Sequence, residues 1–354
     1  MFDQFIGVKP VEERHRLDAV RLEAWLRQHV EGYGGTLEIA QFKGGQSNPT
    51  YRLSAGGRKY ALRRKPSGKL LPSAHAVDRE FKVIRALHRV GFPVARPYAL
   101  CEDDAVIGTA FYVMDCIEGR VLWDQSLPGM SREERRAIWD ELNRVMAQLH
   151  GIDYREVGLA DFGKPGSYIA RQVDRWTKQY RASETQKIEA MDSLIEWLPK
   201  NIPPGDETTV VHGDFRLDNT VFHPTEPRIL AVLDWELSTL GHPLADFAYH
   251  AMSWQIPPGQ FRGIAGLDYA ALGIPTEREY VDLYCARSGR GSIDASTWDY
   301  YVAYNLFRLA AILQGIAKRA LDGTAASTHA ADAGQRAPLL AHLGWQQVEK
   351  ILKR

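Results

Sequence analysis

Residues 210–250 read VVHGDFRLDNTVFHPTEPRILAVLDWELSTLGHPLADFAYH, and this stretch carries most of the chemical information in the chain. The apolar runs TTVV, just before His212, and RILAVL, just before Asp234, are typical of buried strands that bracket a polar loop. We therefore expect His212, Asp214, Asn219 and Asp234 to converge at strand ends. Four such residues in register are more informative than one, because a single loop Asp is more often a turn or cap residue.

The spacing H-x-D-x4-N, followed by a strand and a further Asp, is the arrangement that metal-assisted phosphoryl transfer requires. One carboxylate accepts the proton of a substrate hydroxyl, while an amide and a second carboxylate hold Mg²⁺ on the phosphates. A metal-dependent hydrolase that uses His212, Asp214, Asp234 and either His242 or His250 is an alternative that needs no nucleotide. The spacing favours a kinase, because an amide and a carboxylate already account for the metal without a histidine.

The motifs HGDFRLDN, LDWE and HPLADFA resemble the aminoglycoside phosphotransferase and choline kinase superfamily, and most closely the kinase-like domains fused to some acyl-CoA dehydrogenases. The resemblance extends over roughly residues 35–320 and is specific between 210 and 250. It implies an α+β, protein-kinase-like fold of two lobes, a small sheet-rich N-lobe over residues 1–115 and a larger helical C-lobe over residues 116–354.

The same resemblance implies a role for each residue of the motif. Asp214 would be the catalytic base, Asn219 and Asp234 the Mg²⁺ ligands, and His212 a buried organiser of the loop. Asp246 would be a structural acid that braces this loop.

The first third of the chain should then supply the nucleotide site. The segment FKGGQSNPTYRL, residues 42–53, places Gly44, Gly45, Ser47 and Asn48 in a turn between two strands, where they could face phosphates. It lacks the G-x-G-x-x-G pattern of protein kinases, and an ordinary hairpin turn is the alternative. The segment YVMDCIEG, residues 112–119, fits the adenine-binding hinge of such a fold, with these hinge residues: Asp115, Cys116 and Ile117.

A departure from the protein-kinase pattern falls on the third strand. There Arg63 stands where the phosphate-binding lysine is expected, and Lys65, on the same face by strand alternation, is the second choice. An arginine keeps the positive charge and adds a planar fork. Glu80, in the helix that follows, is the natural partner of this cation, although an exposed surface acid beside Arg79 is an equal alternative.

Two further features bear on the acceptor. Residues 164–187 contain six bases and two acids, and Arg171, Arg175 and Lys178 lie roughly opposite the apolar stripe of a predicted helix. They form either an anion-binding surface, ill-suited to a polycationic antibiotic, or a solvated helix face. Glu236, two residues past Asp234, either assists the metal or the substrate or is a solvated carboxylate.

Periodicity and turn signals predict the flanking elements. We expect helices over 16–31, over 76–90 and from a capping box at Ser131 onward, and strands over 36–40, 50–54 and 59–63. The segment AVIGTAFYVMDCI, residues 105–117, supplies two more runs of strand length, and residues 320–334 are expected to form a loop.

The 354 residues carry 44 basic and 44 acidic side chains, so no net charge draws the chain to nucleic acid or to an anionic membrane. Three cysteines without a CxxC spacing, and no apolar N-terminal stretch, lead us to expect a cytoplasmic protein. We expect a phosphotransferase that uses ATP and Mg²⁺ and acts on a hydroxyl of a small molecule, for which a hydroxyacyl-CoA is a candidate. The alternative is a catalytically impaired pseudokinase module that only binds nucleotide.

Overall fold

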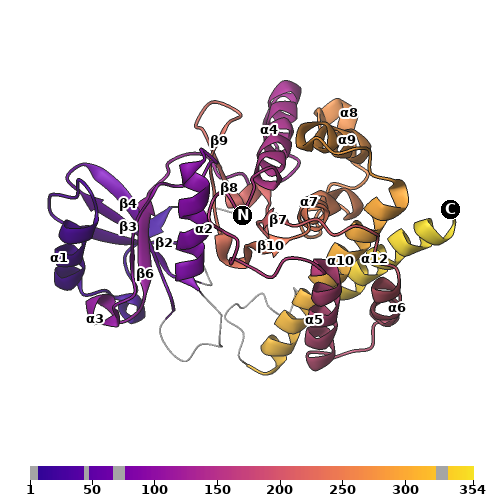
Figure 1. Cartoon of the computed structure of the whole chain (residues 1–354), viewed down its shortest axis with the longest axis horizontal. Coiled ribbons are helices and arrows are strands. Elements are labelled where there is room, and N and C mark those ends of the chain that lie inside the picture. Colours follow the sequence, from indigo (N-terminus) through magenta and orange to yellow (C-terminus); the bar gives the residue numbers. More distant parts are fainter. Residues whose placement is uncertain (1–6, 44–47, 67–75, 324–333) are drawn as a thin grey trace. The chain divides into compact units, whose positions relative to one another are not determined.

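The computed structural model describes residues 7–43, 48–66, 76–323 and 334–354 (Figure 1). Contacts between residues divide the chain into two compact units, each assembled from segments that are distant in sequence. Unit 1 contains Met1–Trp123, Arg155–Phe162 and Asp218–Ser238, and unit 2 contains the rest. The lobe boundaries at 1–115 and 116–354 stay a prediction. The loop expected over 320–334 falls mostly on residues that lie outside the described ranges.

Unit 1 is built on a six-stranded antiparallel sheet with the order β1-β2-β3-β4-β6-β5. The strands expected near 36–40, 50–54 and 59–63 are present, and Gly56 and Gly57 join two of them in a tight hairpin. Both glycines have positive φ (56° and 77°), which the favoured two-residue hairpin turn requires. The strand bounds are as follows: β1 Val8–Lys9, β2 Glu38–Phe42, β3 Thr50–Ala55, β4 Arg58–Arg64, β5 Pro97–Cys101 and β6 Phe111–Asp115.

Two helices of unit 1 match the predicted periodicity. Helix α1, Ala19–His29, begins where the side chain of Asp18 accepts a hydrogen bond from the Arg21 N–H, and it packs its Leu22 and Leu26 into the apolar core of the sheet. Helix α2, Val77–Arg89, contacts β5 and β6 and carries Glu80 on its buried side.

One sequence expectation in this unit was wrong. Of the two strands expected within 105–117 only β6 exists, because the first run forms the short helix α3, Asp104–Ile107. Asp103 caps this helix by accepting from the Ala105 N–H, and Gly108 ends it with a left-handed backbone (φ 84°). Strand β5 was not predicted. It begins with Pro97, which lacks an N–H donor and is tolerated here because β5 is an edge strand.

The remainder of unit 1 is a small hairpin. Strands β8, Thr220–Phe222, and β9, Ile229–Val232, pair antiparallel, and the 3-10 helix η5, Trp235–Leu237, follows and contacts α2. The backbone N–H of Val232 donates to the Pro93 carbonyl at 2.8 Å, which ties the hairpin to the chain between α2 and β5. The buried strand expected before Asp234 is therefore confirmed.

Unit 2 is largely helical. Helix α4, Arg132–His150, starts with the predicted capping box, in which Ser131 and Glu134 exchange side-chain and backbone hydrogen bonds. Strand β7, Thr209–Val211, is the expected strand before His212, and it pairs antiparallel with β10, Thr239–Gly241. The other helices are α5 Tyr168–Ala182, α6 Glu189–Trp197, α7 Pro243–Ala251, α8 Tyr269–Leu272, α9 Glu277–Ser288, α10 Ala295–Leu321 and α12 Ala337–Leu352.

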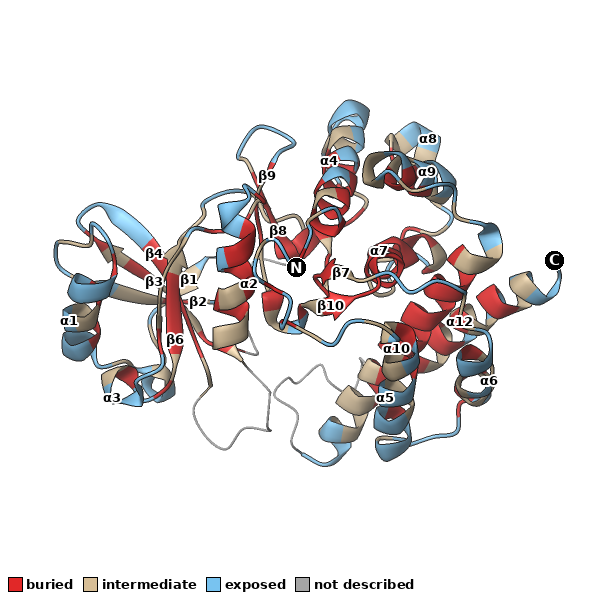
Figure 2. Cartoon of the chain, in the orientation of Figure 1, coloured by how far each residue is buried: buried red, intermediate tan, exposed pale blue. Residues whose placement is uncertain are grey.

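Helices α7 and α10 form the centre of unit 2. Every residue of α7 is buried, and α10 is buried along most of its length, as the red ribbons of Figure 2 show. Helices buried to this extent form the core of the unit, and the few polar side chains on them need partners inside it. Within the described residues, no helix is both long enough and apolar enough to span a membrane.

Two histidines are buried in this centre. His242 caps α7 by accepting from the Leu244 N–H at Nδ1, and its Nε2 lies 3.1 Å from the Tyr301 hydroxyl. His250 contacts the hydroxyl of Tyr280 at 2.8 Å. Burial lowers the pKa of each histidine to about 4, so both are neutral in the folded protein near pH 7.

We predict that the free energy of unfolding decreases as the pH is lowered from about 6.5 toward 4. In this range His242 stays neutral when folded but takes up a proton when unfolded, so acid favours the unfolded state. The variant His242→Asn keeps a capping acceptor and removes this titration. Urea unfolding at pH 7 and pH 5 should show a pH-dependence smaller by about 1–2 kcal/mol than in the wild type.

The exposed histidine of α12, His342, provides the control. His342→Asn should keep the wild-type pH-dependence. An equally steep loss of stability in His242→Asn would contradict the assignment.

Candidate active site

Arg63, near the end of β4, forms the centre of a buried charge cluster in unit 1. Its Nε lies 2.8 Å from Glu80 Oε2, so the pairing expected from the sequence is present. The Glu80 side chain is only 1% exposed, which excludes the alternative of a surface acid. The carboxylate also accepts hydrogen bonds from Asn48 Nδ2 at 2.8 Å and from the Tyr112 hydroxyl at 3.0 Å. Burial raises the pKa of Glu80, while the adjacent Arg63 opposes that rise.

The same guanidinium reaches two carboxylates that follow β9. Arg63 Nη2 donates to Asp234 Oδ1 at 2.7 Å and to Glu236 Oε2 at 3.4 Å. Although burial disfavours the cation, Glu80 and these carboxylates hold the pKa of Arg63 above its ordinary value. One cation therefore faces three acids, and the excess of negative charge favours the approach of a further cation.

Asn219 and Asp234 are brought together by the β8–β9 hairpin. Thr220 pairs with Val232, and the Leu233 N–H donates to the Asn219 carbonyl at 2.8 Å, so the two predicted metal ligands flank the open end of the ladder. Asp234 has a left-handed backbone (φ 65°), which Asp tolerates better than most residues. Its side chain is 31% exposed. An amide and a carboxylate are hard oxygen donors, and Mg²⁺ uses one or two carboxylates together with phosphates and water. The donor set therefore fits Mg²⁺.

The other residues predicted to bind phosphate lie at the edge of the Arg63 cluster or outside the described residues. Lys65 lies beyond the end of β4, and its Nζ is 3.9 Å from Asp78 Oδ1. Its side chain is 34% exposed, against 10% for Arg63. Asn48 is fully buried against Glu80. Gly44, Gly45 and Ser47 lie outside the described residues.

The expected hinge follows β6. The Tyr98 hydroxyl donates to Asp115 Oδ1 at 2.6 Å, and burial together with this carboxylate raises the pKa of Tyr98 to about 12. The Cys116 N–H donates to the Lys59 carbonyl at 3.3 Å, and Ile117 is half-buried. The backbone N–H of Cys116 is thus engaged with the sheet.

In unit 2 the loop after β7 is held by a buried carboxylate. Asp246, on α7, accepts from the His212 N–H at 2.7 Å and from the Gly213 N–H at 2.8 Å, and it contacts His150 Nε2 at 3.3 Å. Burial alone would raise the pKa of Asp246, but these hydrogen bonds and the neighbouring histidines hold it below its ordinary value. The brace expected of this acid is present. Gly213 has a φ of 82°, which glycine adopts without steric cost.

Asp214 is oriented by three groups on this loop and on α7. Its backbone N–H donates to His212 Nδ1 at 3.2 Å, and the ring of His212 is fully buried. Its carboxylate accepts from the Tyr249 hydroxyl at 2.6 Å and lies 3.1 Å from Arg216 Nε. The carboxylate that the motif assigns as a base therefore has a fixed direction.

Three residues of this arrangement were not predicted to be part of a site. Tyr249 and Arg216 contact Asp214, and Arg308 on α10 donates to the Gly213 carbonyl at 2.8 Å. Arg308 is almost fully buried and lies over the Tyr249 ring, 5.0 Å from its centroid. Arg308 had a signal in the sequence, because it is a charge inside an apolar helical segment. Arg216 also had a signal in the sequence, because it lies two residues after Asp214.

The basic face of α5 has partners of its own. Arg171 donates to the carbonyls of Gly166 and Lys164, and Lys178 pairs with Asp174 at 2.8 Å. The guanidinium carbon of Arg175 lies 5.5 Å from the centroid of the Trp176 ring. These local contacts are typical of a solvated helix face, so a part in substrate binding stays a prediction.

Known proteins similar to this chain fall into two groups. Mouse acyl-CoA dehydrogenase family member 10 is 46% identical over 99% of this chain, and mouse family member 11 is 45% identical over 96%. The chain spans only 33% and 44% of the length of these two relatives.

Solved structures form the second group. A provisionally assigned aminoglycoside phosphotransferase from Ralstonia eutropha is 59% identical, with 95% of this chain and 99% of that chain covered and a TM-score of 0.88. Choline kinase from Cryptosporidium parvum (13% identical, TM-score 0.63, 95% and 97% covered) shares the fold. So does spectinomycin phosphotransferase, solved with ADP and spectinomycin (12% identical, TM-score 0.61, 93% and 98% covered).

The sequence pattern of the phosphotransferase enzyme family matches residues 38–281, which is well over half of the chain. This range includes the charge cluster around Arg63 and the loop that carries Asp214. The antiparallel sheet followed by a largely helical region is the α+β kinase-like fold of these relatives. The chain belongs to the phosphotransferase enzyme family.

Proposed function

We propose that this protein transfers the terminal phosphoryl group of ATP to a hydroxyl on a small molecule, with Mg²⁺ as the metal. The observation that carries the proposal is the fixed carboxylate of Asp214. It sits on a loop clamped by Asp246, and its oxygens contact Tyr249 and Arg216. Such a carboxylate can accept the proton of an acceptor hydroxyl as the oxygen attacks phosphorus.

Unit 1 supports the nucleotide part of the proposal. Arg63 is a buried cation suited to phosphate oxygens, and Glu80 holds it in place as a charge partner. Asn219 and Asp234 would hold Mg²⁺, which neutralises charge on the phosphates when bound. A related phosphotransferase has been solved with ADP, which is consistent with nucleotide binding in this fold.

The acceptor is the finer part of the proposal. The two mouse relatives that match nearly the whole chain are acyl-CoA dehydrogenase family members, so a hydroxyacyl-CoA is the acceptor that we favour. The excess of bases in residues 164–187 would suit the CoA phosphates better than a polycationic antibiotic.

A pseudokinase that binds nucleotide without transferring phosphate is the second candidate. The contact between Arg63 and Asp234 favours it, because it engages a carboxylate that the metal would also use. The hydrolase alternative has less support. Among the described residues, no three His, Cys, Asp or Glu side chains are grouped to hold a metal ion.

The first test of the proposal concerns the base. Asp214→Asn should lower kcat by about 10²–10⁴-fold, the usual effect of removing a positioned general base, and should leave the Kd for MgATP unchanged. ATP consumption with hydroxylated acceptors measures the first quantity, and calorimetry measures the second. Asp282→Asn, an exposed change on α9, is the matched control. If wild type turns over an acceptor and Asp214→Asn does so equally fast, the base lies elsewhere, whereas a wild type that binds MgATP without any turnover is a pseudokinase.

The second test concerns the metal. Asp234→Asn tolerates the left-handed backbone and removes one negative charge. We expect it to raise the MgATP concentration needed for the half-maximal increase in Tm by about 10–100-fold. The exposed Asp104→Asn is the control. An unchanged Tm response in Asp234→Asn would remove Asp234 from the metal site.

The third test separates Arg63 from Lys65. Arg63→Ala should weaken MgATP binding by about 10–100-fold and Lys65→Ala by much less, since Arg63 is the buried cation. Arg63→Ala should also lower the free energy of unfolding by about 3–5 kcal/mol, because Glu80 is left buried without its charge partner.

The double variant Arg63→Ala/Glu80→Gln separates binding from stability. It should regain most of the lost stability while MgATP binding stays weak. Weaker binding in Lys65→Ala than in Arg63→Ala would instead assign the phosphate contact to Lys65.

A further inference from the structure

Arg52, in the middle of β3, is a partly buried cation whose guanidinium is not used by the fold. Within the described residues its side chain makes no hydrogen bond and no ion pair, and its Nε is buried without an acceptor. A solvated arginine would keep this N–H in water, and a structural arginine would donate it, because a buried N–H without an acceptor is costly. The guanidinium is therefore available to a ligand.

Arg52 lies on the same face of the sheet as the charge cluster. The β3–β4 register pairs Arg52 with Ala61, and Ala61 shares its face with Arg63, two residues further along β4. The neighbours of Arg52 in the chain, Tyr51 and Leu53, belong to the apolar core under α1. Arg52 therefore points away from α1, toward the side of the sheet on which Figure 1 shows α2.

Small apolar side chains flank Arg52 across the sheet. The register places Ala40 of β2 on one side of it and Ala61 of β4 on the other, and Met114 of β6 follows in the same row. Helix α2, on this face, makes its main strand contacts with β5 and β6. Alanines beside a long side chain give a flat ring room to lie against the sheet, and ligand sites combine apolar surface of this kind with a few polar groups.

Strand β4 connects this row to the charge cluster at one end and to the predicted hinge at the other. Two residues along a strand span about 6.6 Å, so Ala61 is one such step from Arg63. At the start of β4, the Lys59 carbonyl accepts from the Cys116 N–H at 3.3 Å. Burial raises the pKa of the Cys116 thiol, and the positive charge of Arg52 opposes that rise, which indicates that Arg52 lies near the hinge. A nucleotide that extends along β4 from phosphates at Arg63 would bring its base to Arg52.

The chemistry of a guanidinium predicts what this contact recognises. The group is planar, delocalised and weakly hydrated, and it stacks on aromatic faces. Stacking reads no atoms on the edge of a base, so it accepts adenine and guanine alike and gains less from the smaller ring of a pyrimidine. An in-plane contact would instead favour guanine, whose O6 and N7 accept two N–H groups of one arginine. The alanines on both sides favour the stacked arrangement, because an in-plane contact needs no flat surface.

We propose that Arg52 stacks on the base of the nucleotide and selects purine over pyrimidine nucleoside triphosphates as phosphate donors. Ala40 and Ala61 let the base lie flat against the sheet, while Arg63 meets the phosphates. The inference rests on the proposed function in taking the ligand of unit 1 to be a nucleotide. It does not require that phosphate is transferred.

Calorimetry tests the stacking separately from catalysis. The probes are adenosine, ADP and ATP, followed by GTP, CTP and UTP, with Mg²⁺ present for the triphosphates. Arg52→Ala should raise the Kd of adenosine, ADP and ATP by the same factor, about 5–50-fold, because the lost contact is to the base. It should raise the Kd of GTP to the same extent, and those of CTP and UTP by less.

Two further variants separate stacking from charge. Arg52→Tyr keeps a planar face without the charge and should bind purine nucleotides nearly as well as the wild type, whereas Arg52→Lys keeps the charge without the plane and should resemble Arg52→Ala. Arg58→Ala, an exposed change at the hairpin of the same two strands, is the matched control and should leave every Kd at the wild-type value. All three Arg52 variants should fold, with a ligand-free Tm within about 2 °C of the wild type.

Three results would overturn the inference. An unchanged Kd for adenosine in Arg52→Ala would remove the base contact, a loss that grows with the number of phosphates would assign Arg52 to the phosphates, and a loss confined to GTP would indicate an in-plane contact.

The proposed function can fail independently. A wild type that binds purine nucleotides through Arg52 but never transfers phosphate would contradict the proposed function and leave the contact standing. A wild type that transfers phosphate, with a KM for ATP that Arg52→Ala does not change, would do the reverse.

Discussion

The buried carboxylate of Asp246 is the constraint on which the chemistry of unit 2 depends. A charge in the protein interior is tolerated only when hydrogen bonds replace its hydration, and here two backbone N–H groups and His150 do so. The donors are the N–H groups of His212 and Gly213, so satisfying the carboxylate also fixes the loop that presents Asp214. Arg308 holds the same loop through the Gly213 carbonyl. The hydrogen bonds that stabilise the buried Asp246 carboxylate therefore also fix the orientation of Asp214, the proposed base.

Unit 1 contains the opposite case, a buried cation that is stabilised by surrounding carboxylates. Arg63 is buried, and Glu80, Asp234 and Glu236 surround it. An arginine suits this position because its fork can contact several carboxylates at once, which a lysine ammonium does with less directional control. The cluster retains an excess of negative charge. A divalent cation bound between this cluster and a nucleotide would offset that charge.

Local sequence signals predicted most of the elements that position the candidate site. The periodicity of α1, the capping box of α4, the glycine hairpin between β3 and β4, and the apolar runs of β7 and β9 are all visible in short windows of sequence. The wrong prediction at α3 and the missed strand β5 also have local causes. An apolar run between Asp103 and Gly108 became a helix because its caps outweighed its strand-like composition, and the edge strand β5 begins at a proline that discourages a strand assignment.

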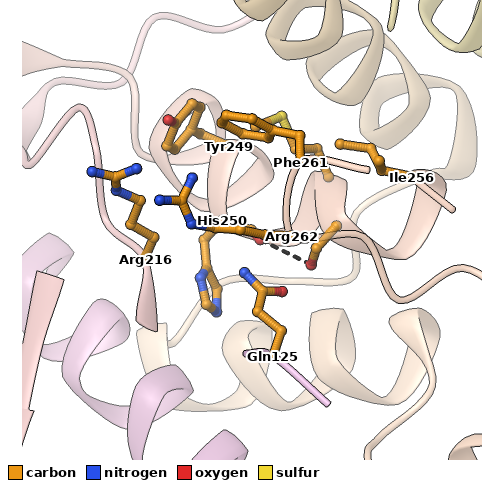
Figure 3. A pocket seen from close by; sticks show the side chains of 9 residues that line it. Gln125, Arg216, Tyr249, His250, Ile256, Phe261 and Arg262 are labelled. Atoms are coloured by element: carbon orange, nitrogen blue, oxygen red, sulfur yellow. Dashed lines mark hydrogen bonds between the residues drawn. The ribbon is translucent and has the colours of Figure 1, made fainter. Parts of the chain in front are cut away.

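The sequence by itself determined the identity and spacing of His212, Asp214, Asn219 and Asp234, because these residues lie within one stretch whose covalent geometry limits their separation. Only the tertiary structure decided their partners. Arg63 and Asp234 are 171 positions apart, and Arg308 is 95 positions from the carbonyl that it holds. Gln125 and Arg262 line the same small pocket of unit 2 although no periodicity links them (Figure 3). Contacts of this kind depend on packing between distant segments, and packing has no signature in the spacing of residues along the chain.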